Sequence, residues 1–268
     1  MATSNPAFNS PAFSLNQSSA IMHRAATPSS EQLDALYGKP SATPEQTDRM
    51  TYEDTIRKAI GAFAVLAIGA AIGWFVPLLA IPAAIVGFVL ALVNIFKKQP
   101  SRTLVLLYSA AQGVFVGGIS AIFEMTQYSG IATQALIGTA AVFIVTLLLF
   151  RSGKIRASKK ATKVFLIAMI GYAVFSLVNL GLMLFGGTDQ AFGLRSAEIF
   201  GIPLGLILGV LVVLLAAYSL VLDFDQIQKG VNNGAPRIFA WRAVFGIVLT
   251  VVWLYIEILR MLAILRGE

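Results

Sequence analysis

The chain has 268 residues, of which 57% are hydrophobic and 12% are charged. A soluble domain has roughly 45 to 50% apolar and 25% charged residues, so this composition predicts an integral membrane protein. The net charge of +7 comes from basic residues in short segments between apolar runs, which favours orientation in a bilayer over nucleic-acid binding.

Two residue types limit the chemistry further. The chain has no Cys, which excludes disulfides and thiolate sites, and its one His, His23, lies in a polar N-terminal segment. Histidine-based catalysis and histidine metal sites inside the membrane are therefore excluded.

Residues 1–50 are rich in Pro, Ser, Ala, Asn, Thr and Gln, which predicts a disordered cytoplasmic tail. The segment lacks the basic start and apolar core of a signal peptide. Order is expected to begin at Thr51, whose hydroxyl can cap a helix, and Glu53 and Asp54 complement the positive end of that helix.

Seven apolar segments follow, each long enough to cross a bilayer at about 20 residues per span. They predict an all-α membrane domain, a seven-transmembrane-helix bundle over residues 51–268. Pro77 and Pro82 should make the first two segments a tight hairpin. The expected spans are about 58–76, 79–96, 103–123, 131–150, 164–185, 199–222 and 239–265.

Lys and Arg in the connections predict the orientation of the bundle. One side carries most of them, whereas the other has only Arg195 between residues 186 and 198. By the positive-inside rule, the N-terminus faces the cytoplasm and the C-terminus faces outward. Glycines four residues apart, such as Gly113 and Gly117 or Gly201, Gly205 and Gly209, predict close helix packing inside one molecule.

Three carboxylates near the last two spans are the main functional candidates: Asp223, Asp225 and Glu257. An ionised side chain in hydrocarbon costs at least about 2.5 to 3.5 kcal/mol, so it needs a partner or a function. Asp223 and Asp225 point about 200° apart on a helix, so one should face the core and the other the headgroups or a basic loop. Glu257 has a simple structural alternative, an ion pair with Arg260 one turn further on.

Enzyme classes do not fit these residues. The last segment has no Lys for a retinal Schiff base, and no His or Lys within the membrane could activate Ser120 in Gly117-Gly118-Ile119-Ser120. We therefore expect no enzyme activity and no cofactor.

Several segments together resemble the Bax inhibitor-1 family, also described as YccA-like or transmembrane Bax inhibitor motif proteins. The most specific are Leu-Asp-Phe-Asp-Gln-Ile at 222–227 and Trp-Leu-Tyr-Ile-Glu-Ile-Leu-Arg at 253–260. Supporting segments are 112–120, which is rich in Gly, and Met-Thr-Tyr-Glu-Asp at 50–54. The resemblance covers about 51–268 and implies a bundle whose last helix is central, surrounded by the other six.

The resemblance also implies a pH-sensitive calcium leak gated by an acidic pair. Carried over to this sequence, the pair is Asp225 and Glu257, with Asp223 as an additional acid. Two buried carboxylates that face each other can share a proton and attract a divalent cation, so such a pair forms a proton-linked latch and a transient Ca²⁺ site.

Thirty-two residues separate Asp225 from Glu257, which leaves two arrangements open. If the last helix began at residue 239, Glu257 would lie about 27 Å along it and could not reach Asp225. Either the pair forms one latch, or the acids form two clusters. In the second arrangement, Asp225 pairs with Arg242 or Arg102 at the inner end, and Glu257, Arg260 and Glu124 mark an outer mouth.

The leading hypothesis is a pH-sensitive cation channel in a bacterial inner membrane that lets Ca²⁺ leak down its gradient. The alternative is a non-conducting scaffold or stress and cell-death regulator, which acts through the tail and the basic cytoplasmic loops on partners or anionic lipids.

Overall fold

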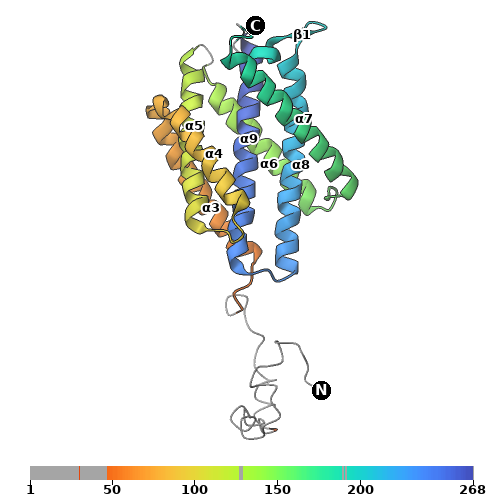
Figure 1. Ribbon diagram of the computed structural model, residues 1–268. Coiled ribbons are helices and arrows are strands. Elements are labelled where there is room, and N and C mark those ends of the chain that lie inside the picture. The colour runs from red at the N-terminus through yellow and green to blue at the C-terminus, as the bar shows by residue number, and fades with distance from the viewer. Residues whose placement is uncertain (1–29, 31–46, 127–128, 189, 191, 268) are drawn as a thin grey trace, which may run out of the picture. The chain divides into compact units, whose positions relative to one another are not determined.

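The computed structural model describes residues 30, 47–126, 129–188, 190 and 192–267. Residues 1–29 and 31–46, most of the expected tail, lie outside the described residues. Within the described part, seven helices are long and apolar enough to cross a membrane (Figure 1). This confirms the predicted all-α membrane bundle.

The folded unit begins at Thr47 rather than at residue 51. Met50 is buried, and its backbone N–H donates to the Ala235 carbonyl at 2.7 Å. Helix α3 (Tyr52–Phe75) then starts as expected, because the Thr51 hydroxyl accepts from the Asp54 N–H at 3.1 Å. The Asp54 carboxylate also binds Arg237 Nε at 2.9 Å, which ties the start of α3 to the start of the last helix.

Helices α3 and α4 form the expected hairpin. After α3, Pro77 begins the 3₁₀ turn η3 (Pro77–Leu79), and α4 (Ala80–Phe96) follows directly. Proline fits there because the first helical turn needs no backbone donor.

Helix α5 (Arg102–Thr126) crosses α3 so closely that only glycine fits at the contact. A Cβ on Gly113 would overlap the Leu66 carbonyl, and one on Gly117 would overlap the Ala70 carbonyl. The spacing of Gly113 and Gly117 therefore serves packing between helices of one molecule, whereas Gly201 has no atom of a neighbouring helix within 4 Å of an added Cβ.

Helix α6 (Ile131–Arg151) and helix α7 (Lys159–Leu184) continue the bundle. Ser158 caps α7 by accepting from the Ala161 N–H at 3.2 Å. Helix α7 lies at the periphery of the bundle in Figure 1, and most of its apolar side chains are exposed.

The sixth span differs most from its expected range of 199–222. Residues 198–203 form a short hairpin, β1 (Glu198–Ile199) paired antiparallel with β2 (Ile202–Pro203), and Gly201 lies in its turn with φ of 74°. Helix α8 begins at Leu204 and continues to Asn232. The helix continues past Asp223 and Asp225 because Phe224 and Ile227, on its core-facing side, are also buried.

The last helix, α9 (Ala240–Arg266), lies in the middle of the bundle after the 3₁₀ turn η5 (Arg237–Phe239) (Figure 1). Its backbone packs against α3, α5, α6 and α8, and it has the largest buried share of the seven spans. Helix α4 packs mainly on α5, and α7 approaches α9 through the Tyr172 side chain. The centrality of the last helix is confirmed, although four helices rather than six form its main backbone contacts.

The two ends of the bundle differ in charge. We call the end with connections 97–101, 152–158 and 233–236 the basic end, and the end with connection 185–203 and Arg266 the hairpin end.

Candidate functional site

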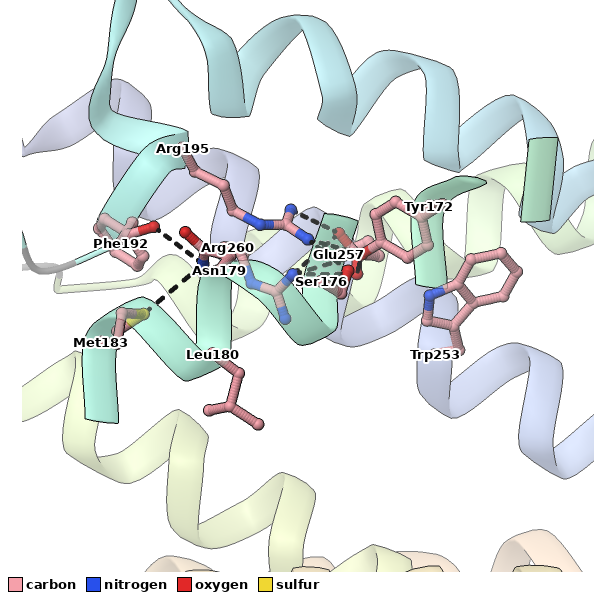
Figure 2. Close-up of a pocket in the computed structure, with 10 residues that line it drawn as sticks. All are labelled: Tyr172, Ser176, Asn179, Leu180, Met183, Phe192, Arg195, Trp253, Glu257 and Arg260. Carbon is pink, nitrogen blue, oxygen red and sulfur yellow. Dashed lines mark hydrogen bonds and ion pairs between the residues drawn. The ribbon is translucent and has the colours of Figure 1, made fainter. Parts of the chain in front are cut away.

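Glu257 is the most deeply buried acid among the described residues, with 2% of its surface exposed. Arg260 Nη1 donates to both carboxylate oxygens, at 3.1 and 3.3 Å, and Arg195 Nη1 lies 3.6 Å from Oε2. The Tyr172 hydroxyl donates to Oε1 in a short hydrogen bond. Figure 2 shows both guanidinium groups directed at this carboxylate.

Three separate elements build this cluster. Helix α9 supplies Glu257 and Arg260, α7 supplies Tyr172, and the 3₁₀ turn η4 (Gly193–Ser196) supplies Arg195. Arg195 is 4% exposed, and its Nη2 donates to the Tyr172 hydroxyl at 2.9 Å. The cluster therefore fastens the connection between α7 and α8 onto the central helix.

Asn179 of α7 holds the η4 turn in place. Its Oδ1 accepts from the Leu194 N–H at 2.6 Å, and its Nδ2 donates to the Phe192 carbonyl at 3.3 Å. Gly193 lies so close that an added Cβ would overlap Asn179 Oδ1, and its φ of 60° also favours glycine.

The cluster borders a cavity of about 450 Å³ between α7, α9 and the η4 turn (Figure 2). One part of the wall is polar, with Glu257, the two arginines, Tyr172, Ser176 and Asn179. The other part is apolar, with Leu180, Met183, Phe192 and Trp253. Two guanidinium groups against one carboxylate give the wall a net charge of +1.

Asp223 forms a second polar cluster with α9, further from the hairpin end than Glu257. The Thr250 hydroxyl donates to Asp223 Oδ2 at 2.8 Å and lies 3.2 Å from the Ser219 hydroxyl. Gly246 makes room for the carboxylate, since a Cβ there would lie 2.8 Å from Asp223 Oδ1. No Lys or Arg among the described residues forms an ion pair with Asp223.

Asp225 points away from this cluster, as the two-residue spacing requires. Its Oδ2 pairs with Lys229 Nζ at 2.6 Å, on the same face of α8. The expected partners of Asp225 lie elsewhere. Arg102 stacks on Trp241, and Arg242 donates to the Lys97 and Lys98 carbonyls at the basic end. The core-facing acid of α8 is thus Asp223, whereas the resemblance assigned that place to Asp225.

Glu124 caps a helix and does not join Glu257. Its carboxylate accepts from the Gly130 N–H at 2.7 Å and the Ala132 N–H at 3.1 Å, at the start of α6. These donors are backbone groups that the first turn of a helix leaves unpaired, so the acid stabilises α6.

These positions decide between the two arrangements. Asp223 is level with Thr250, which precedes Glu257 by seven residues, and Asp225 lies two residues further toward the basic end. At 1.5 Å per residue, Asp225 and Glu257 are roughly 13 Å apart along the bundle. At this separation, Asp225 and Glu257 do not form a shared latch or a joint Ca²⁺ site. Each pairs with its own cations, Asp225 with Lys229 and Glu257 with Arg195 and Arg260.

The three acids therefore lie apart. Glu257 pairs with Arg195 and Arg260, Asp223 lies with Thr250 and Ser219, and Asp225 pairs with Lys229 instead of Arg242 or Arg102. No three Asp, Glu, His or Cys side chains gather at one point within the described part of the chain.

Arg195 and Tyr172 belong to the Glu257 cluster, although the sequence did not predict them as site residues. Arg195 stood out as the lone cation in the hairpin-end connection, and Glu257 as the lone acid inside the last span. Pairing these two isolated opposite charges would have suggested the contact, because buried charges in membranes usually pair with one another.

In a comparison with models of known protein families, one family matches nearly the whole chain. The model of the family described as Bax inhibitor 1 like matches residues 5–267. No curated protein matches the chain, and no solved structure does.

Proposed function

Because the chain belongs to the Bax inhibitor 1 like family, we propose that it is a pH-sensitive cation leak channel, with Ca²⁺ as the permeant ion. The observation that carries this proposal is the buried Glu257 of the central helix, neutralised by Arg195 and Arg260. A carboxylate in this position is costly for stability, which favours a role in function.

The pathway that we propose follows α9 past the two acids. Asp223, with Thr250 and Ser219, offers a cation several oxygen ligands of the kind that Ca²⁺ prefers. At Glu257, the two guanidinium groups pair with the carboxylate oxygens, so these oxygens are not available as ligands, and the positive charges repel an approaching cation. The arrangement therefore corresponds to a closed channel, and we call the contacts of Glu257 with Arg195, Arg260 and Tyr172 the lock.

The lock depends on the charge of Glu257. The groups that face Glu257 are Tyr172 of α7, Arg195 of η4 and Arg260 of α9. Without the carboxylate charge, the two arginines repel each other and the η4 turn is released from α9. The pH sensitivity of the proposed leak is what the family resemblance implies.

The charge distribution supports a cytoplasmic basic end, and hence an outward C-terminus. The six cations between 151 and 163 are all exposed at that end. We place the protein in a bacterial inner membrane with the lock near the outer surface.

Asp223 and Asp225 provide a matched pair for testing the pathway. In liposomes with an internal calcium dye, wild type should admit Ca²⁺ at a rate that differs between pH 6 and pH 8, and Asp223→Asn should slow uptake severalfold. Asp225→Asn should leave uptake nearly unchanged, because Asp225 points away from the Asp223 cluster and its partner Lys229 is exposed.

Equal effects of the two substitutions would contradict the proposed pathway. Absence of uptake by wild type at every pH would instead favour the alternative, a membrane scaffold. The observation behind that alternative is the exposed basic connection 151–163, which suits acidic partners or anionic lipids.

A further inference from the structure

The cavity beside the lock has the features of a binding site. Its volume of about 450 Å³ lies within the roughly 300 to 1,000 Å³ of small-molecule pockets. It combines an apolar wall with a few convergent polar groups, the usual composition of such pockets. The net charge of +1 on its wall favours a negatively charged ligand.

The guanidinium group of Arg260 has hydrogen-bond donors that contact no described residue. Its hydrogen bonds to described residues all come from Nη1, which contacts Glu257 and Tyr172. In Figure 2, the other terminal nitrogen of this guanidinium carries no dashed line. A guanidinium offers five N–H donors in a planar fork that matches the oxygens of a phosphate or carboxylate. These free donors therefore favour binding of an oxyanion.

The apolar part of the cavity wall suggests that the anion carries a hydrocarbon chain. Leu180 and Met183 are 51% and 40% exposed, and they continue the exposed apolar face of α7. Figure 2 shows Leu180 apart from the polar cluster and Trp253 beside Tyr172. An acyl chain could thus pass from the cavity onto the surface of α7, where lipid covers the helix.

The depth of the cavity matches a lipid headgroup. Arg260 lies six residues before the end of α9, and Asn179 lies five residues before the end of α7. These positions are about 8 to 9 Å inside the helix ends, near the boundary between headgroups and hydrocarbon.

We propose that the cavity between α7, α9 and η4 binds the phosphate headgroup of an anionic phospholipid, held by Arg260 and with its acyl chain along Leu180. The net positive wall selects an anionic over a zwitterionic headgroup. Occupancy would share Arg260 between the phosphate and Glu257, which would weaken the pair of Arg260 with Glu257. That consequence for the lock rests on the proposed function, whereas binding itself does not.

Trp253 in the cavity wall allows a direct binding test. A reporter with Trp74→Phe and Trp241→Phe keeps Trp253 as its single tryptophan, and circular dichroism checks its fold. In vesicles of phosphatidylcholine, a few per cent of phosphatidylglycerol with brominated acyl chains should quench Trp253 about tenfold more effectively than brominated phosphatidylcholine. Arg260→Gln should abolish this preference.

Arg266→Gln is the matched control at the same end of α9. Arg266 donates to the Ser129 carbonyl outside the cavity, so its loss should leave the preference intact. Equal quenching by both lipids, or equal loss in both variants, would overturn the proposal. Relief of quenching by millimolar glycerol phosphate would identify a soluble anion as the ligand, and equal quenching by a brominated fatty acid would identify a carboxylate; either result would also overturn it. Because quenching reports binding alone, its outcome does not depend on whether calcium leaks.

Discussion

Replacing Glu257 by glutamine should lower the free energy of unfolding by about 3 to 5 kcal/mol, the usual effect of removing one partner of a buried ion pair. The reason is the charge balance of the lock. With two arginines and one glutamate, the lock carries +1, and the substitution raises this to +2 in a buried place. Unfolding in detergent micelles, followed by circular dichroism, measures the loss.

Arg195→Gln is the informative comparison, because it breaks the same ion pair with the opposite effect on charge. It brings the lock to zero and leaves Glu257 paired with Arg260 at 3.1 Å. We expect it to cost about 1 to 3 kcal/mol, the penalty for a few lost hydrogen bonds. The double variant returns the lock to +1 and should be more stable than Glu257→Gln alone. Equal losses in the two single variants would show that net charge does not govern this cluster.

The second large effect is expected where α3 crosses α5. Gly117→Ala should destabilise the protein by about 3 kcal/mol or more, since an added methyl overlaps the Ala70 backbone and the helices must separate. Thermal unfolding in detergent measures this loss.

Gly61→Ala is the control within the same helix pair. A Cβ at Gly61 meets no atom within 4 Å, so alanine there should stabilise α3 by about 0.5 to 1 kcal/mol through its better helix propensity. If both substitutions had the same effect, the close crossing would not contribute to stability.

Much of the fold could be predicted from the sequence because it depends on local patterns. Apolar length predicted the seven spans, Pro77 predicted the first hairpin, and Thr51 predicted the start of α3. These signals lie within one or two turns of the residues that they govern.

The end of the sixth span shows the limit of such patterns. The apolar run stops at Leu222, but helix α8 continues to Asn232 because Phe224 packs on Phe143 and Phe150 of α6. At the other end, residues 199–203 belong to the expected span, but they form a hairpin together with Glu198. Both outcomes depend on contacts between distant segments.

The site was less predictable than the fold for the same reason. The spacing of Asp223 and Asp225 predicted that only one would face the core, but which one depends on the rotation of α8 against α9. The partner of Glu257 was harder still. Arg195 lies 62 residues earlier in the chain, in a turn whose position depends on Asn179.

Calcium uptake by liposomes containing Arg195→Gln tests the central claim, that the lock on Glu257 holds a cation pathway closed. At pH 7.5, this variant should admit Ca²⁺ several times faster than wild type, and Arg266→Gln should behave like wild type. Adding Asp223→Asn to Arg195→Gln should reduce the rate again, because the opened pathway still passes Asp223. Uptake at the wild-type rate in Arg195→Gln, or a raised rate that Asp223→Asn leaves unchanged, would contradict the account.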